Sequence, residues 1–63
     1  MNIRVKEYRK KANLTQAQLA KKIGTVQNAV SQWEKGGRTP SVKMCKKMAG
    51  VFGISVDELI GEE

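Results

Sequence analysis

The segment from Leu14 to Pro40 constrains the fold of this chain more than any other part of it. It holds two short amphipathic helical patterns on either side of a turn with a single glycine, Gly24. The first pattern gathers its apolar residues on one stripe: Leu19, Ala20 and Ile23. Glycine can adopt a left-handed conformation at no steric cost, so we predict that one helix ends at Gly24 and that a second begins close by.

The second pattern, over residues 27–35, separates a polar face from an apolar face. The polar face carries Gln27, Asn28, Ser31, Gln32 and Lys35. The residues expected to pack inward are Val26, Ala29, Val30 and Trp33. A bracing helix followed by a helix with an outward polar stripe is typical of a helix-turn-helix, whose second helix enters the DNA major groove.

Three further helical patterns cover residues 2–12, 42–52 and 56–60. The expected N-caps are Thr15, with Gln18 completing a capping box, then Thr25 or Val26, then Ser41 and Ser55. No segment shows a strand pattern, and the connections are short. The predicted fold is therefore all-α, a compact five-helix bundle that forms one domain over residues 1–63.

Apolar stripes predict the rest of the core. The stripe of the first helix is Val5, Tyr8 and Ala12, and that of the fourth is Val42, Cys45, Met48, Ala49 and Phe52. Leu59 and Ile60 are expected to close the core. Gly50 is unusual because a glycine inside a helix costs about 1 kcal/mol, and close approach of another backbone is one reason to place it there.

Charge is distributed unevenly along the chain. Twelve Lys and Arg against six Asp and Glu give a net charge of +6. All the basic residues lie between Arg4 and Lys47, against two glutamates, so residues 1–56 carry +10 and residues 57–63 carry −4. A basic body of this kind indicates a polyanionic partner, with a solvated surface as the alternative.

Composition argues against several classes of protein. The single cysteine, Cys45, allows no disulfide within the chain, and the absence of histidine argues against a zinc site. The first residues lack the apolar core of a signal peptide, and no apolar run is long enough to span a membrane. A cytoplasmic location and no membrane association are therefore expected.

No set of residues suggests catalysis. The chain has no histidine to act as a base, its acidic residues form no recognisable pair, and Gly36-Gly37 is too short for a phosphate-cradling loop. Cys45 lies on an apolar stripe and is expected to be a small core residue rather than a reactive thiol. The sequence predicts no enzyme activity, no metal, no cofactor and no small-molecule ligand.

Three carboxamide side chains suggest what the polar face reads. Gln27, Asn28 and Gln32 project from the same side of the helix at residues 27–35. Gln and Asn pair bidentately with N6 and N7 of adenine, and each good pair supplies about 1–3 kcal/mol of discrimination. A solvated polar face is the alternative, and the helix-turn-helix context favours base readout.

Several motifs occur in the order found in the Cro/C1-type (XRE-like) helix-turn-helix family, which includes the lambdoid phage repressors and Cro proteins. The motifs are Leu14-Thr15-Gln16, Leu19-Ala20, Gly24, Val30-Ser31, Trp33-Glu34, Gly36, Pro40-Ser41 and Gly53-Ile54-Ser55-Val56-Asp57-Glu58-Leu59. The chain resembles this family from Val5 to Ile60. The resemblance implies a lambda-repressor-like DNA-binding domain.

The resemblance also implies a role for each matching position. Base readout is expected from Gln27, Asn28, Gln32 and Val26, the last of which could touch a thymine methyl group. Phosphate contacts are expected from Gln16, Ser31, Lys35, Gly37, Arg38 and Thr39. Gln16 should also steady Gln27. Arg9 and Glu34 match a structural ion pair between the first and third helices.

The chain departs from the family pattern at a few positions. Val26 stands where Ser or Thr is usual, and Lys35 replaces the commoner asparagine. The loop over residues 36–40 is shorter than in some phage repressors. Nothing follows Glu63, so the ligand-sensing or self-cleaving domain of longer members is expected to be absent or to have been removed.

The leading hypothesis is a sequence-specific regulator of transcription, a repressor that binds double-stranded DNA. It would bind a pseudo-palindromic operator as a homodimer, at least on DNA, with half-sites about 34 Å apart. The expected dimer surface is the last helix with the end of the fourth. The alternative is an antitoxin or bridging module that acts mainly through a protein partner, and a third hypothesis is non-specific architectural DNA binding.

Overall fold

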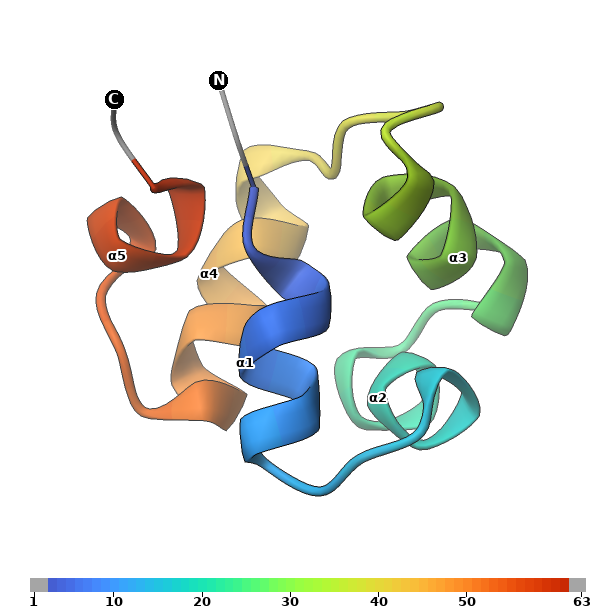
Figure 1. The fold of residues 1–63 in the computed structure, drawn as a ribbon, viewed down its shortest axis with the longest axis horizontal. Helices are drawn as coiled ribbons and strands as arrows, with labels where there is room; N and C mark the ends of the chain where they lie inside the picture. The colour runs from blue at the N-terminus through green and yellow to red at the C-terminus, as the bar shows by residue number, and fades with distance from the viewer. Residues whose placement is uncertain (1–2, 62–63) are drawn as a thin grey trace.

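The computed structural model describes residues 3–61, and within that range it contains five α-helices and no strand (Figure 1). The helices are α1 (Val5–Lys11), α2 (Gln16–Ile23), α3 (Gln27–Lys35), α4 (Val42–Phe52) and α5 (Val56–Ile60). The all-α, five-helix fold predicted from the sequence is confirmed.

Capping side chains and one glycine set the helix ends that the sequence predicted. Thr15 and Gln18 form the capping box at the start of α2, and Gly24 ends that helix in the left-handed conformation with φ +78°. Ser41 and Ser55 each accept a hydrogen bond from the backbone N–H three residues further on. These bonds satisfy N–H groups that a helix leaves unpaired in its first turn.

The first helix begins later than the pattern over residues 2–12 predicts. It starts at Val5, with Arg4 as an N-cap that makes no side-chain capping bond. The backbone of Arg4 is not helical, with φ −89° and ψ 46°, and its N–H donates to the carbonyl of Leu59 near the end of α5, at 2.8 Å. The predicted start at Asn2 lies outside the described residues.

The core lies where the five helices meet. Its buried members are Val5, Leu19, Ala20, Ile23, Val30, Trp33, Cys45, Met48, Ala49 and Leu59. Ile60, Tyr8 and Phe52 are only partly buried at its edge, and the rings of Tyr8 and Phe52 stack with centroids 6.0 Å apart. Cys45 is therefore a core residue, and burial raises the pKa of its thiol, which keeps it protonated and unreactive.

Three apolar residues predicted to lie inside do not. Ala12 is exposed because α1 ends before it. Val26 is 66% exposed because it is the N-cap of α3, with extended backbone that directs it away from the helix stripe. Val42 is 70% exposed because it begins α4 beside an open recess rather than beside packed neighbours. Gly50 is also exposed, and a Cβ built on it would meet no atom within 4 Å, so no close backbone approach explains it.

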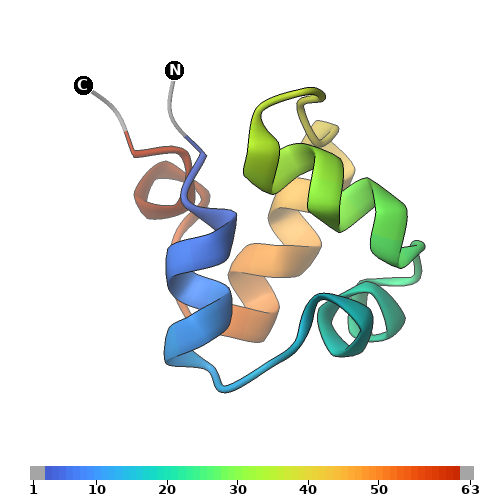
Figure 2. The ribbon, with the colours of Figure 1, turned by 45° about the vertical axis from the view of Figure 1, so that its right-hand side comes forward.

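Helices α2 and α3 form a pair at one side of the bundle. Figure 1 and Figure 2 show α2 and α3 together on one side of α1 and α4, with α5 on the other side. In α3 the exposed residues are Gln27 and Asn28 in the first turn and Lys35 at the end, whereas Ser31 and Gln32 between them are half-buried. Within residues 3–61, no helix combines the length and apolar character required to cross a membrane.

Candidate nucleic-acid interface

Helix α3 presents its carboxamides at the surface. Gln27 and Asn28, in its first turn, are exposed, and Gln32, one turn further along, is half-buried. Val30 and Trp33 anchor the opposite side of the helix in the core. This packing fixes the rotation of α3 and therefore the direction in which the polar side chains point.

The N-terminus of α3 has no side-chain cap. The sequence offers Thr25 or Val26 as the N-cap, and the structure shows that it is Val26. Valine has no side-chain oxygen that could accept a capping hydrogen bond. Backbone N–H groups of the first turn thus stay without a capping side chain at a helix end that carries partial positive charge. Val26 itself stands beside them as an exposed apolar side chain.

A surface recess of about 440 Å³ joins the reading face to the loop after α3. Its lining, called the reading recess below, consists of Val26, Asn28, Ala29, Gln32, Gly37 and Arg38. Three residues predicted to read bases and two predicted to contact phosphate therefore line one hollow. No charged acidic side chain is among them, so the recess can accept a polyanion without like-charge repulsion from its own walls.

The loop after α3 is folded back onto that helix. Gly36 ends α3 in the left-handed conformation with φ +83°. The backbone N–H groups of Gly37 and Arg38 then donate to the carbonyl of Gln32, at 3.0 and 3.4 Å. Both N–H groups are thereby engaged within the chain, and the exposed side chains of Arg38 and Thr39 are the polar groups that the loop offers outward.

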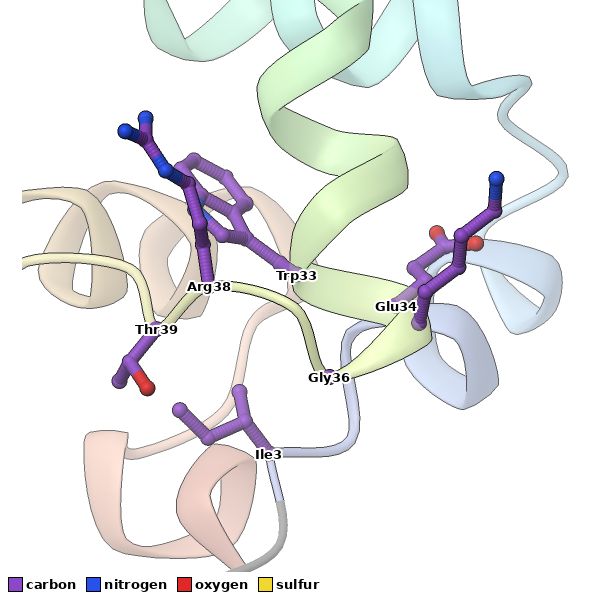
Figure 3. A pocket seen from close by; sticks show the side chains of 7 residues that line it. Ile3, Trp33, Glu34, Gly36, Arg38 and Thr39 are labelled. Atoms are coloured by element: carbon purple, nitrogen blue, oxygen red, sulfur yellow. The ribbon is translucent and has the colours of Figure 1, made fainter.

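A second hollow of about 320 Å³ lies on the other side of this loop (Figure 3). Its lining comprises Ile3, Trp33, Glu34, Lys35, Gly36, Arg38 and Thr39. Figure 3 shows the Arg38 side chain extending away from Ile3, with its guanidinium group at the far end. Arg38 lines both hollows, so its positive charge lies close to each of them.

A hydrogen-bonded chain connects Gln27 to the interior. The Nε2 of Gln27 donates to Oε1 of Gln16 at 3.5 Å, and the Nε2 of Gln16 donates to Oε1 of Glu34 at 3.0 Å. The carboxamide of Gln16 is thus oriented with its nitrogen toward the carboxylate and its oxygen toward Gln27. The sequence does not predict the contact between Gln16 and Glu34, because residues 18 positions apart share no local pattern that indicates a contact.

Glu34 is held by Arg9. The Nε of Arg9 lies 2.6 Å from Oε2 of Glu34, and the two side chains are only 12% and 5% exposed. Arg9 also donates from one terminal nitrogen to Oε1 of Glu34 at 3.2 Å and from the other to the carbonyl of Leu14 at 2.8 Å. The pair therefore ties α1 to α3 and to the segment that leads into α2.

Two opposing effects set the pKa of Glu34. Burial alone would raise it, since a charged carboxylate is poorly solvated there. The hydrogen bonds from Arg9 and Gln16, with the positive charges of Arg9 and Lys6, outweigh burial and hold the pKa below its ordinary value. The carboxylate is thus ionised at neutral pH and available as an acceptor for Gln16.

Five of the predicted contact residues do not line the reading recess: Gln16, Gln27, Ser31, Lys35 and Thr39. Ser31 is half-buried in the middle of α3, and Lys35 is exposed at its end. Gln16, at the start of α2, is half-buried beside Gln27. Among residues 3–61, no group of three or more potential metal ligands comes together.

Comparison with known proteins assigns this arrangement to a family. A family model described as helix-turn-helix matches residues 5–59. An uncharacterized HTH-type transcriptional regulator of Archaeoglobus fulgidus is 39% identical over 59 residues, which cover 94% of this chain and 83% of that protein. The HTH-type transcriptional activator BcrR of Enterococcus faecalis is 36% identical over 63 residues, which cover 98% of this chain and 31% of that protein.

A solved structure shares the fold. The P22 c2 repressor, in a crystal structure with the synthetic operator 9T, superposes with a TM-score of 0.86 at 30% identity. The match covers 95% of this chain and 91% of that one. These related proteins are DNA-binding regulators of transcription and not enzymes, as the sequence predicted for this chain.

Proposed function

The chain belongs to the Cro/C1-type helix-turn-helix family of transcriptional regulators, and we propose that it is a repressor that reads a specific DNA sequence with α3 in the major groove. The observation that carries this proposal is the reading recess. There the carboxamides of Asn28 and Gln32 meet the guanidinium of Arg38 on one open face. Base-reading and phosphate-binding groups must lie side by side in this way if one helix is to enter a groove.

Gln27 is prepared to pair with adenine. One of its N–H groups is directed at Gln16, which leaves its oxygen and its second N–H for a partner. Those two groups match N6 and N7 of adenine in the major groove. Gln16, itself held by Glu34, thereby orients the carboxamide of Gln27 before DNA binds. A glutamine without such a partner would lose conformational entropy when it adopts this orientation on DNA.

Phosphate contacts are proposed for Arg38, which lines the reading recess, and for several polar groups outside its lining. Arg38 and Lys35 supply positive charge at the end of α3 and in the loop, and Thr39 and Ser31 supply hydroxyl groups. Gln16 retains a second N–H besides the one directed at Glu34. Gly37 belongs to this set only as a place where the backbone can come close to a phosphate, because its own N–H already donates to the carbonyl of Gln32.

A homodimer on DNA is proposed because one recognition helix buries too little area for a specific site. The half-sites of such a homodimer are expected one helical turn of DNA, about 34 Å, apart. The pseudo-palindromic operator follows from the two-fold symmetry of such a pair.

The dimer surface is proposed at α5 together with the start of α4, instead of the end of α4 that the sequence favours. Val42 is 70% exposed, against 37% for Val51 at the other end of α4. It borders an apolar recess of about 180 Å³ lined by Ile3, Thr39, Pro40, Val42, Cys45, Val56 and Ile60. The Val42→Glu variant should bind a single half-site as well as the parent chain and lose cooperative binding to a paired site, whereas Val51→Glu, the control, should keep both.

The first experiment is selection from a random duplex pool at near-physiological salt with excess competitor DNA. A two-fold symmetric motif is expected. Gln27→Ala should then relax preference at one base position of each half-site and cost about 1–3 kcal/mol, whereas Arg38→Ala should weaken all sequences alike and reduce the salt slope by about 1. Binding without any enriched motif, lost as salt rises, would overturn specific recognition.

The sign of regulation is tested separately. A repressor acts by occupying promoter DNA, and the selected motif, placed over a promoter in front of a reporter gene, should lower expression when the protein is present. Raised expression from every placement of the site would assign the chain to activators, the class in which BcrR is named.

A further inference from the structure

We propose that Gly37 determines specificity by leaving the space in which the carboxamide of Gln32 rests. A Cβ built on Gly37 would lie 2.5 Å from Oε1 and 3.7 Å from Cδ of Gln32. The first distance is far shorter than two such atoms tolerate, so any side chain at position 37 forces the carboxamide to move. This inference rests on the proposed function, since it assigns Gly37 a role in base readout.

Backbone conformation does not explain this glycine. Gly24, Gly36, Gly53 and Gly61 all have positive φ, where only glycine is comfortable, and Gly37 does not. Gly50 has ordinary helical backbone and open space around it. Gly37 thus differs from Gly24, Gly36, Gly50 and Gly53 in that a neighbouring side chain occupies the place of its missing Cβ.

Backbone hydrogen bonds hold the loop after α3 against Gln32, the residue whose side chain rests beside Gly37. The carbonyl of Gln32 accepts hydrogen bonds from the N–H groups of Gly37 and Arg38, so residue 37 cannot drift away from Gln32 without losing them. The relation between the two residues is therefore fixed by backbone, and only the carboxamide is free to respond. Both residues line the reading recess, where a shift of the carboxamide alters what DNA meets.

The cost of filling this space falls on recognition rather than on folding. The clashing atom is the end of a flexible, half-buried side chain, which can rotate toward solvent. Gly37→Ala should therefore keep its melting temperature within about 4 °C of the parent chain, the shift that a loss of about 0.5–1 kcal/mol gives at this size. The Gln32 position of the motif should lose its preference, which a good side-chain pair makes about 5-fold to 150-fold.

The test is a double-mutant cycle read out by base preference. Affinities of the parent, Gly37→Ala, Gln32→Ala and the double variant are measured against duplexes that vary one base pair at a time, with Gly50→Ala as a matched glycine-to-alanine control outside the interface. Gly37→Ala should flatten preference at the same base pair as Gln32→Ala, and it should add nothing in the Gln32→Ala background.

Two results would overturn the inference. If Gly37→Ala weakens all duplexes alike, in both backgrounds, then Gly37 serves only to let a phosphate approach the loop. If Gly37→Ala leaves preference and affinity unchanged, the carboxamide of Gln32 is not held for readout. A parent chain without base preference at any position would instead refute the proposed function itself, so the two failures are distinguishable.

Discussion

The Arg9→Ala substitution should strongly destabilise the fold, because it strands a buried charge. Glu34 is 5% exposed and would keep only the N–H of Gln16 as a donor. The carbonyl of Leu14 would lose its bond as well. Removing one partner of a buried ion pair costs about 3–5 kcal/mol, of which most is the penalty of the charge left behind.

This loss is large for so small a chain. A domain of this kind has about 5–15 kcal/mol of stability in total, and sixty-odd residues place it at the lower end. Each kcal/mol shifts the melting temperature by about 4–8 °C at this size, so a loss of 3 kcal/mol lowers it by roughly 12–24 °C. Thermal and urea denaturation at neutral pH, followed by circular dichroism, measure the effect.

A double variant separates two contributions to this loss of stability: the missing ion pair and the unpaired charge that remains on Glu34. Arg9→Met with Glu34→Leu removes both charges and leaves apolar side chains of similar size, so it should recover most of the stability lost in Arg9→Ala. A melting temperature for Arg9→Ala within about 4 °C of the parent chain would show that the burial argument is wrong. A double variant no more stable than Arg9→Ala would show that packing by the arginine stem dominates.

Three further predictions concern stability in acid, the glycines of α4 and the capping box of α2. The free energy of unfolding should fall as the pH drops below about 4.5, because the pKa of Glu34 is lower in the folded chain than its ordinary value. Protonation of Glu34 then removes a stabilising contribution that is present at higher pH. Glu34→Gln should abolish the share of this pH dependence that comes from Glu34. Gly50→Ala should raise stability by about 0.5–1 kcal/mol, since the site is helical and open, whereas Gly53→Ala, at φ +71°, should lower it. Thr15→Ala should cost about 0.5–2 kcal/mol by urea denaturation, and Thr15→Ser should restore it, since a hydroxyl is all that the capping box needs.

The fold was predictable wherever local chemistry decides it. Capping residues and the left-handed glycine at position 24 act within a few residues of themselves, so the bounds of α2 followed from the sequence. The start of α1 did not, because the apolar pattern extends further back than the helix, whereas the backbone of Arg4 is not helical and its N–H bonds to Leu59, more than fifty positions away. Val42 was misplaced for a similar reason, since helical periodicity gives a side chain's direction but not what lies opposite it.

The site was predictable in its composition and less so in its connections. The carboxamides of α3 and the cation of the loop could be named from their positions, and the structure places Asn28, Gln32 and Arg38, but not Gln27, around one recess. Two relations had no signal in the sequence. One is the hydrogen bond between Gln16 and Glu34, and the other is the clash that a side chain at Gly37 would make with Gln32. Both depend on tertiary distances that only the packed helices define.

The link through Gln16 joins stability to recognition at a single carboxylate. Oε1 of Glu34 accepts from both Arg9 and Gln16, and Gln16 in turn accepts from Gln27. Gln16→Ala leaves the ion pair intact, so we expect a melting temperature close to that of the parent chain together with weaker base preference at the Gln27 position. Gln16→Glu, which cannot donate to Glu34 and places two carboxylates side by side, should lower both. If Gln16→Ala keeps full preference at that position, Gln27 orients itself on DNA without help, and the buried ion pair supports the fold alone.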